Sequence, residues 1–317
     1  MVLADPAAAR WPTVAAGRGH YESYYLRAVD PAGTRGIWVR HTVSVAPGGT
    51  PNGQLWFTAF DRSAAAPRAI RVDAGPATTG QNSWMRMGGG TFGPSGIDGR
   101  AGSASWSLRR RDGEPTLEHL PRDWMYRARL PRTKLLSLTP SALFDGRVSV
   151  DGETIAVDGW PGMVGHNWGE QHAEQWIWLH GIGFEGADAD TWLDVAVARV
   201  RIGPVVTPWT ANGAVSLGGE RIRLGGLGRR VAVGAASDRC DLRIPGATAT
   251  VTVTASAPST AFVEWDYADP DAGHPPCRVL NCSVADATLT VTRRGLAPVE
   301  LRTSGQAAYE WGRAAGS

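Results

Sequence analysis

The chain has 317 residues, 43% of them hydrophobic, with 32 basic and 30 acidic side chains and a formal net charge of +2. This composition allows a substantial core and excludes an intrinsically disordered protein, and the length suits two domains of ordinary size. The small net charge gives no electrostatic case for binding to nucleic acid or to an anionic membrane.

The start of the chain, residues 1–6, contains neither a basic leader nor an apolar segment, and no later stretch is apolar enough to span a bilayer. We therefore expect a soluble, cytoplasmic protein without an integral membrane segment. The three cysteines, Cys240, Cys277 and Cys282, are too few and too late in the chain for a disulfide framework. Buried free thiols are expected, and a Cys277–Cys282 bridge would require a turn between the two residues.

Residues 1–18 are rich in small residues and proline, and are expected to form an arm over the surface. Residues 19–29 then alternate as in a strand, residues 30–34 (Asp-Pro-Ala-Gly-Thr) signal a turn, and residues 36–45 form a second strand. Folding this hairpin about Ala32 places Glu22 on the same face as Trp38 and Arg40. The sequence thus predicts an inward Glu22–Arg40 ion pair among aromatic side chains.

Short strands separated by turn signals continue along the chain, and no convincing long amphipathic helix interrupts them. The glycines at 88–90 and 93–96 belong to connections, because neither a following lysine nor a strand-to-helix pattern supports a phosphate loop. Further strands are predicted at 54–60, 68–72, 103–110, 134–138, 147–157, 191–202, 214–217, 221–224, 230–233, 240–244, 247–255, 261–267, 281–285 and 287–294.

This pattern predicts an all-β fold, because an antiparallel barrel can accommodate many short strands without leaving an exposed sheet edge. The strands divide near Asp158-Gly159, and each half has enough of them for one barrel of about eight strands. The expected organisation is an N-terminal arm (1–18), an N-terminal barrel (19–158) and a C-terminal barrel (159–317).

The stretch from Gly165 to Gly183 concentrates more aromatic and ionisable side chains than any other part of the chain. Asn167-Trp168-Gly169 predicts a tight turn, because Asn and Gly tolerate positive φ. Residues 174–184 alternate as a strand with Glu174, Trp176, Trp178, His180 and Ile182 on one face. Both faces are largely apolar, as in a strand buried on both sides.

The Gly-His-Asn-Trp-Gly run at 165–169, followed by Trp176 and Trp178, resembles the signature of the hydroxyneurosporene synthase (carotenoid hydratase) superfamily, which includes tocopherol cyclases and lipocalin-like Diels-Alderases. The runs at 20–25 (HYESYY), 37–42 (IWVRHT) and 264–270 (EWDYADP) resemble uncharacterised bacterial members of this superfamily. The resemblance touches both halves of the chain.

The resemblance implies two lipocalin-like antiparallel β-barrels packed side by side, with a lipophilic pocket in or between them. It also implies action on polyenes or prenylated molecules by protonation and hydration, by cyclisation or by a preorganised cycloaddition. No metal or organic cofactor is expected, the expected partner is a lipophilic small molecule, and the substrate and the oligomeric state stay open.

The chemistry can be argued from residue types alone. Hydrating or cyclising an alkene requires a positioned proton donor, such as a carboxyl whose pKa is raised by burial, and aromatic walls that tolerate a carbocation. Candidate acids are Glu22, Glu170 and Asp266, with His166 or His172 as relay. Candidate substrate-binding residues are Tyr24, Trp38, Arg40, Asn167, Trp168, Trp176, Trp178, His180 and Trp265.

Each assignment has a structural alternative. Glu22 and Arg40 could form a purely structural ion pair, His166 and Asn167 could only fix the turn, and the tryptophans could simply fill a core. A metal site is a further alternative, because several possible ligands lie close together in the sequence: His166, Glu170, His172 and His180. Their spacing is not diagnostic, and no metal is assigned. Ser-His-Asp hydrolysis lacks a Gly-x-Ser-x-Gly elbow. Two functional classes remain: an enzyme acting on a lipophilic unsaturated molecule, and a carrier that binds such a molecule unchanged.

Overall fold

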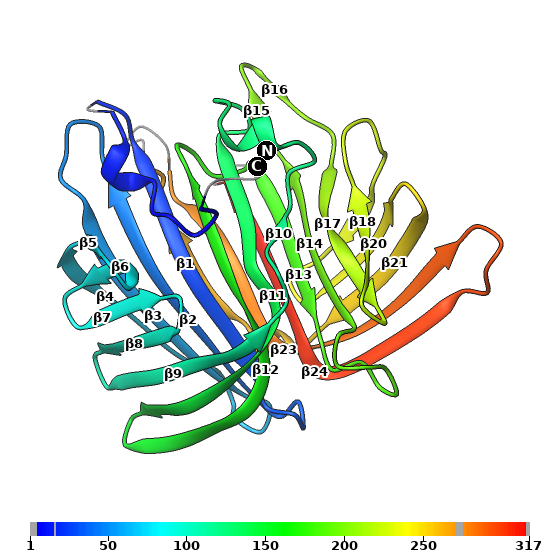
Figure 1. Ribbon diagram of the computed structural model, residues 1–317, viewed down its shortest axis with the longest axis horizontal. Helices are drawn as coiled ribbons and strands as arrows, with labels where there is room; N and C mark the ends of the chain where they lie inside the picture. The colour runs from blue at the N-terminus through cyan, green and yellow to red at the C-terminus, as the bar shows by residue number, and fades with distance from the viewer. Residues whose placement is uncertain (1–4, 16, 271–274, 315–317) are drawn as a thin grey trace.

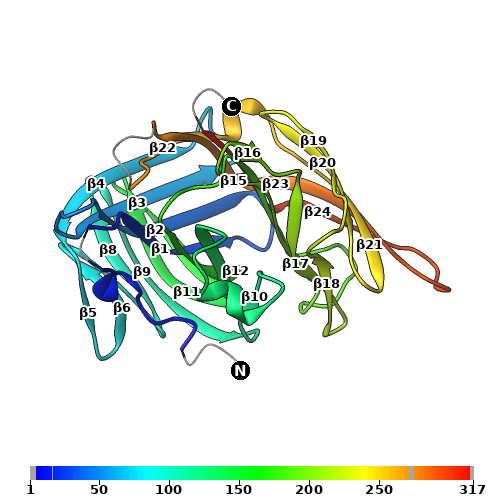
Figure 2. The same cartoon turned by 90° about the horizontal axis from the view of Figure 1, so that it is seen from above.

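Two antiparallel sheets lie side by side in the computed structural model, which describes residues 5–15, 17–270 and 275–314 (Figure 1). The first sheet closes almost into a barrel and the second curls into a half-barrel, as the view from above shows (Figure 2). Each sheet is filled by its own cluster of buried apolar side chains. The all-β, two-domain prediction is therefore confirmed.

The first sheet has 12 strands within the described residues, in the order β4-β3-β2-β1-β12-β11-β9-β8-β7-β6-β5, with β10 paired to β11. Its strands are β1 (His20–Val29), β2 (Arg35–Val45), β3 (Asn52–Asp61), β4 (Arg68–Pro76), β5 (Thr78–Gly80), β6 (Ser83–Met87), β7 (Gly90–Gly93), β8 (Gly96–Ala101), β9 (Ala104–Gly113), β10 (Leu117–Glu118), β11 (Thr133–Val150) and β12 (Glu153–Gly169).

The second sheet has 10 strands in the described part of the chain, in the order β18-β17-β14-β13-β24-β23-β21-β20-β19, with β22 paired to β23. Its strands are β13 (Gln175–Gly181), β14 (Trp192–Arg199), β17 (Thr210–Leu217), β18 (Glu220–Gly225), β19 (Ala232–Ala235), β20 (Arg239–Pro245), β21 (Ala249–Ser256), β22 (Val263–Tyr267), β23 (Cys277–Arg293) and β24 (Val299–Ala314). A small hairpin, β15 (Arg201–Ile202) and β16 (Val205–Val206), and three 3-10 turns, η1 (Trp11–Thr13), η2 (Asp123–Tyr126) and η3 (Ser259–Ala261), complete the described elements.

Several predicted strand boundaries are wrong, because residues that form turns were assigned to strands or the reverse. The predicted strand 147–157 is a hairpin, because Asp151 and Gly152 take φ values of 51° and 83° and form a tight turn between β11 and β12. Positive φ at both central residues is the signature of the hairpin turn that an Asp-Gly pair favours. The Gly-rich region 78–101, expected as connections, forms the short strands β5 to β8, and β24 was not predicted.

Asn167-Trp168-Gly169 is not a turn but the end of β12, paired with β1 on one side and β11 on the other. Residues 159–169, assigned from the sequence to the second domain, therefore continue a strand of the first sheet. The chain changes sheet after Gly169, before β13 begins at Gln175.

The β1–β2 register differs by one residue from the prediction. Glu22 pairs with Val43 and Arg40 pairs with Tyr25, because the turn centres between Ala32 and Gly33 rather than on Ala32. A slip of one residue moves a whole side-chain set to the opposite face of a sheet. Glu22 therefore points into the first barrel and Arg40 points out of it, and the predicted Glu22–Arg40 ion pair does not form; the guanidinium of Arg40 donates to the hydroxyls of Ser23 and Thr42.

The N-terminal segment is not a surface arm but a plug in the first barrel. Trp11 is buried in the core of that barrel, and the backbone N–H groups of Arg10 and Trp11 donate to the carboxylate of Glu22 at 2.8–3.0 Å. His166 Nε2 lies 2.7 Å from Glu22 Oε1, and its Nδ1 lies 3.1 Å from the carbonyl of Pro6. The Glu22 carboxylate thus fastens this segment to β1 and β12.

Burial alone would raise the pKa of Glu22, but the hydrogen bonds and charges of His166 and His20 outweigh it and lower that pKa to about 2. Glu22 is therefore ionised in the folded protein. This is the opposite of the raised pKa that the sequence argument required of an acid catalyst.

The cysteines are free and buried, as expected. Cys277 and Cys282 lie on the single strand β23 with no turn between them. No helix in the described ranges is long and apolar enough to cross a membrane.

We predict that Glu22→Gln lowers the free energy of unfolding by about 3 kcal/mol, because it removes the buried carboxylate that accepts the hydrogen bonds of Arg10, Trp11 and His166. Urea denaturation at pH 7 measures this loss. Glu264→Gln, which removes a half-exposed carboxylate paired with Arg278, is the matched control and should change stability by less than about 1 kcal/mol.

We also predict that the stabilisation provided by the Glu22 carboxylate depends on pH. Its folded pKa lies below its ordinary value of 4.5, so its contribution to stability is complete above pH 4.5 and is lost as the pH falls toward 2. The difference in stability between wild type and Glu22→Gln should therefore shrink on acidification. A difference that stays constant from pH 6 to pH 3 would contradict this account.

Candidate functional site

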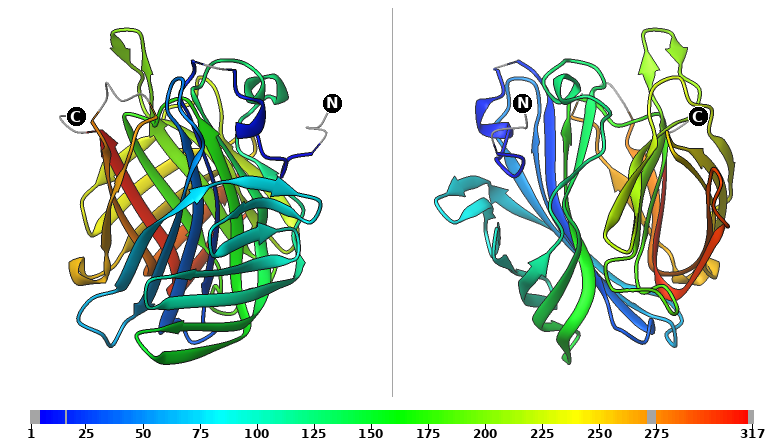
Figure 3. Two further views of the ribbon diagram at one scale, coloured as in Figure 1. Left: turned by 90° about the vertical axis from the view of Figure 1, so that its left-hand side faces the viewer. Right: turned by 45° about the vertical axis from the view of Figure 1, so that its right-hand side comes forward.

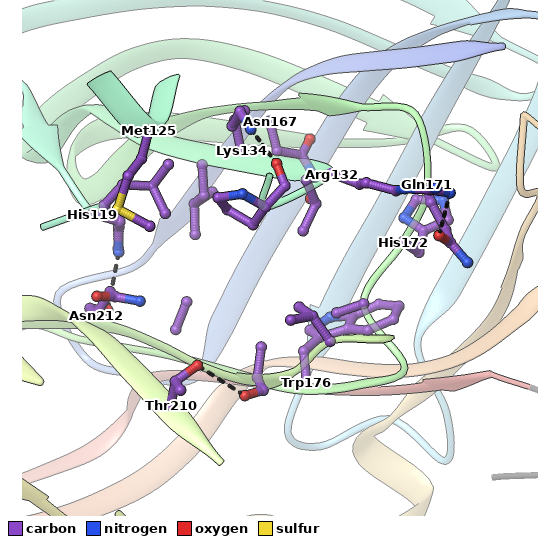
Figure 4. Close-up of a pocket in the computed structure, with 18 of the residues that line it drawn as sticks. His119, Met125, Arg132, Lys134, Asn167, Gln171, His172, Trp176, Thr210 and Asn212 are labelled. Atoms are coloured by element: carbon purple, nitrogen blue, oxygen red, sulfur yellow. Dashed lines mark hydrogen bonds between the residues drawn. The ribbon is translucent and has the colours of Figure 1, made fainter. Parts of the chain in front are cut away.

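A cavity of about 710 Å³ lies between the two sheets, at one end of their interface (Figure 4). Its volume falls in the range of small-molecule sites, and its walls are mainly apolar and aromatic. Two large clusters of buried apolar side chains fill much of the two domains, and Trp38, Trp56 and Phe60 of the first sheet pack into the cluster of the second. The cavity is lined by residues of both domains.

The first wall is the outward face of β1, β2 and β12. Because side chains alternate along a strand, Tyr21 and Tyr25 of β1 point toward the cavity, while Glu22 and Tyr24 point into the barrel. The register places Trp38 and Arg40 of β2 and Asn167 of β12 on the same outward face, and all of these outward residues line the cavity.

The second wall is the outward face of β13, with its neighbours β14 and β24. Trp176 and Trp178 line the cavity, and the alanines Ala196 and Ala198 opposite them on β14 are small enough to leave space in front of the rings. The indole N–H of Trp176 donates to the carboxylate of Glu310 at 2.8 Å.

Two glycines leave space for aromatic rings of these walls to pack directly against the backbone. A Cβ atom at Gly165 would overlap the ring of Tyr25, and a Cβ atom at Gly312 would overlap the indole of Trp176. Both rings therefore lie flat against backbone, which is the physical reason for glycine at these positions. The glycine that begins the Gly-His-Asn-Trp-Gly run thus shapes the cavity and does not make a turn.

The end of the cavity is covered by residues 119–132, which include η2. Lys134, the only lysine of the chain, donates from Nζ to the carbonyl groups of Ala128 (3.0 Å) and Pro131 and so holds this segment. Burial lowers the pKa of Lys134 to about 8, although the carboxylate of Glu170 acts in the opposite direction. Arg132 donates to Gln171, next to His172 (Figure 4).

A buried acid–base cluster adjoins the cavity where His119 lines it. Asp194 accepts hydrogen bonds from the indole N–H of Trp178 at 3.0 Å and from the hydroxyl of Ser137. His119 Nε2 lies 3.0 Å from Ser137 Oγ, and Nδ1 lies 3.2 Å from the carbonyl of Asn212. Burial would raise the pKa of Asp194, but the charge and hydrogen bond of His119 outweigh this and lower it.

The hydrogen bonds of this cluster link His119 to Asp194. The hydroxyl of Ser137 donates to Asp194, so Ser137 Oγ is an acceptor for Nε2 of His119. Nδ1 of the same ring faces the carbonyl of Asn212. His119 is thus connected through Ser137 to the carboxylate of Asp194.

Other polar groups face the cavity from the first wall and the loop after it. Oδ1 of Asn167 is buried and has no hydrogen-bond partner among the described residues, so it is an acceptor available to a ligand. His172 donates from Nε2 to the carbonyl of Ala268 at 3.2 Å. Burial, with the charge of Arg40, lowers the pKa of His172 to about 3, so this ring is neutral.

The structure brings six of the sequence candidates together in the cavity wall, and eight others lie elsewhere. Those in the wall are Trp38, Arg40, Asn167, His172, Trp176 and Trp178. Those outside it are Glu22, Tyr24, His166, Trp168, Glu170, His180, Trp265 and Asp266.

The candidates outside the wall have evident structural contacts. Tyr24 stacks on His166 inside the first barrel, and Trp168 lies beside His166 there. Glu170 pairs with Arg18 at 2.6 Å, and the side chain of Asp266 is exposed. Trp265 packs in the core of the second sheet.

The metal alternative finds no support in these positions. His166 bonds Glu22 inside the barrel, Glu170 pairs with arginine, His172 faces the cavity and His180 is bonded to Arg27. No three His, Cys, Asp or Glu side chains in the described part of the chain come together as a possible metal site.

Sequence reasoning missed His119, Ser137, Asp194, Tyr267 and Glu310. The first three lie far apart in the chain and carry no local motif, so no spacing rule could bring them together. The hydroxyl of Tyr267 donates to Glu310 at 3.3 Å, and its ring centroid lies 4.2 Å from the Arg40 guanidinium.

We predict that Gly165→Ala destabilises the protein by about 1–3 kcal/mol, because the new methyl group overlaps the Tyr25 ring and forces it toward the cavity. Thermal or urea denaturation measures the loss. Gly234→Ala is the matched control: an added Cβ there meets nothing closer than 3.8 Å, and the expected change is about 0.5 kcal/mol or less. Equal effects at the two sites would refute the role given to Gly165.

No family model matches this chain. The Mycobacterium tuberculosis protein Rv0493c, which is uncharacterised, is 33% identical over 178 residues, or 54% of this chain and 51% of that protein. The chain thus matches about half the length of this curated relative.

Three solved structures match over nearly the whole chain. They are CghA with Sch210972 (TM-score 0.63, 12% identity, 95% of this chain and 90% of that chain), an AttH-like protein of Nitrosomonas europaea (0.58, 13%, 99% and 97%), and kievitone hydratase of Nectria haematococca (0.52, 11%, 94% and 89%). At these identities the likeness concerns the fold. The resemblance drawn from the sequence is confirmed at that level: this chain has the two-domain, all-β fold of these three proteins.

Proposed function

We propose that this protein binds a lipophilic, unsaturated small molecule in the cavity between its domains and hydrates or cyclises it without a cofactor. The observation that carries the proposal is the cavity itself, about 710 Å³ in volume, with aromatic walls and a buried acid–base cluster at its edge. An apolar space with few, well-placed polar groups is typical of a site for a hydrophobic ligand.

The proton donor in this proposal is His119. Its imidazolium transfers a proton to one carbon of an electron-rich double bond, which leaves a cation on the other carbon and a neutral imidazole. In a hydration, water adds to the cation and the imidazole takes back the surplus proton. In a cyclisation, a second double bond attacks the cation, and the new cation formed by ring closure loses a proton to the imidazole, which leaves a double bond in the product. Asp194, through Ser137, stabilises the charged imidazole and so positions the donor.

The aromatic side chains of the two walls would stabilise the cation. Tyr25 and Trp178 are in edge-to-face contact where the two walls meet, with ring centroids 5.6 Å apart, and Trp176 lies on the same face of β13 as Trp178. Ring faces attract positive charge, most strongly where water is excluded. Asn167 Oδ1 would accept a hydrogen bond from a hydroxyl group of the ligand and fix its orientation.

The comparisons support this reaction class without naming a substrate. One structure of the same fold is a kievitone hydratase, and another, CghA, was solved with the small molecule Sch210972. That a single fold serves different small molecules agrees with reactions controlled mainly by the shape of a cavity.

A carrier function is the second candidate, and one observation favours it. Both nitrogens of His119 are already engaged by protein acceptors, Ser137 and Asn212, so the proton must leave an existing hydrogen bond to reach a ligand. A carrier would bind the molecule in the same cavity and release it unchanged.

The first experiment is mass spectrometry of an organic extract of the purified protein, followed by incubation of the protein with the extracted molecule and with a panel of polyenes and prenylated phenols. A hydrated or cyclised product identifies the enzyme. Binding without any product identifies a carrier. If none of these molecules binds, the proposed ligand site is refuted.

We predict that His119→Gln lowers turnover by about 10²–10⁴-fold and leaves ligand affinity within roughly tenfold, because it removes the proton donor and keeps a side chain of similar size. Ser137→Ala should act in the same direction by breaking the link to Asp194. The matched control is Ser216→Ala, which removes another buried serine hydroxyl, one without a hydrogen-bond partner in the described structure. Full turnover in His119→Gln would refute the assignment of the donor.

A further inference from the structure

Large exposed apolar side chains gather around the mouth of the cavity. Trp124 and Leu227 are 56% and 67% exposed, and Leu130 and Ile202 are exposed as well, yet all four also line the cavity. Val205 lies beside this set, in the hairpin that carries Ile202. The only other large hydrophobic side chains exposed in the described residues are Leu143 and Leu296.

These side chains come from three separate segments of the chain: the segment with η2, the β15–β16 hairpin and the loop after β18. The η2 segment and the β15–β16 hairpin lie at the same end of the molecule, as Figure 3 shows from two sides. Three loops that converge with apolar tips form one surface, which we call the apolar rim: Trp124, Leu130, Ile202, Val205 and Leu227. A contiguous exposed patch of this kind marks an interaction site.

The η2 segment also carries a local excess of positive charge that the net charge of the chain conceals. Residues 122–132 contain Arg122, Arg127, Arg129 and Arg132 and one acidic residue, Asp123. The guanidinium groups of Arg122 and Arg127 are on exposed residues and make no hydrogen bond or ion pair with the described residues. Exposed arginines beside tryptophan and leucine are the combination that binds the surface of an anionic bilayer.

We propose that the apolar rim docks on the surface of an anionic phospholipid bilayer, with Trp124 and Leu227 inserted at the level of the headgroups and Arg122 and Arg127 against the phosphates. The cavity then opens directly toward the lipid, and a lipophilic molecule passes between bilayer and cavity without crossing water. This inference goes beyond the proposed function, because neither the apolar rim nor its positive charge depends on a reaction in the cavity.

A second copy of the chain fits this surface less well. A twofold contact through the rim would bring the arginine-rich segments of two copies to the same interface, where like charges repel. An anionic bilayer satisfies both the apolar and the charged part of the surface.

The test is co-sedimentation of the 317-residue protein with phosphatidylcholine vesicles, prepared with and without a third of phosphatidylglycerol, at low and high salt. We expect binding to the anionic vesicles, weaker binding to neutral ones, and loss of binding as salt screens the charges. Arg122→Gln/Arg127→Gln should weaken binding by roughly tenfold or more, and Trp124→Ser/Leu227→Ser by a similar factor. Leu296→Ser, at an exposed leucine outside the rim, is the control and should bind like wild type.

The proposal is overturned if the wild type does not sediment with anionic vesicles or if both double variants bind as well as the wild type. It is also overturned if sedimentation equilibrium shows a dimer that Trp124→Ser/Leu227→Ser dissociates, since the rim would then be covered by a second copy. Unchanged thermal midpoints confirm that the variants fold, because all the altered side chains are exposed. No ligand is present in this assay, so its failure leaves the proposed function to its own test.

Discussion

The arrangement of the two domains depends on a buried arginine at their interface. Arg27 of β1 points out of the first barrel, is completely buried, and donates to His180 Nδ1 at 2.8 Å and to the carbonyl of Ser283 at 2.9 Å, both in the second domain. Its burial lowers its pKa to about 9. Since a buried charge is tolerated only with partners in place, the second sheet has to meet the first in this register.

His180 can serve Arg27 only as a neutral acceptor. Burial and the neighbouring guanidinium lower the pKa of His180 to about 4, which leaves Nδ1 free to accept while Nε2 donates to the carbonyl of Pro140 at 2.8 Å. With the carbonyl of Ser283, these hydrogen bonds join four chain segments that are distant in sequence. Beside them the two outward faces separate, and the aromatic rings that line the gap make a cavity instead of a closed interface.

Buried polar groups fall into two sets with different consequences. Glu22 and His166 are closed off in the first barrel by the N-terminal segment, and their hydrogen bonds to Arg10, Trp11 and Pro6 hold that segment in place. His119 and Asp194 lie at the interface and adjoin a space large enough for a ligand. The same residue types thus stabilise a fold in one place and offer chemistry in the other, because only the second set faces a cavity.

The amino-acid sequence by itself determined the all-β class, the two domains and the two aromatic strand faces, because strand alternation and turn residues act locally. It placed Trp176 and Trp178 on one strand face, where the structure has them lining the cavity, because side-chain direction along a strand follows from its periodicity. Asn167 lies in a strand where the sequence predicted a turn. The tertiary structure alone decided which side chains of β1 and β2 line the cavity. The hairpin is centred half a residue away from Ala32, which shifts the register by one residue, so Arg40 lines the cavity while Glu22 points into the barrel. The tertiary structure alone also joined His119, Ser137 and Asp194. His119 follows β10 and Ser137 lies on β11 of the first sheet, and Asp194 on β14 meets them only because the two sheets pack together.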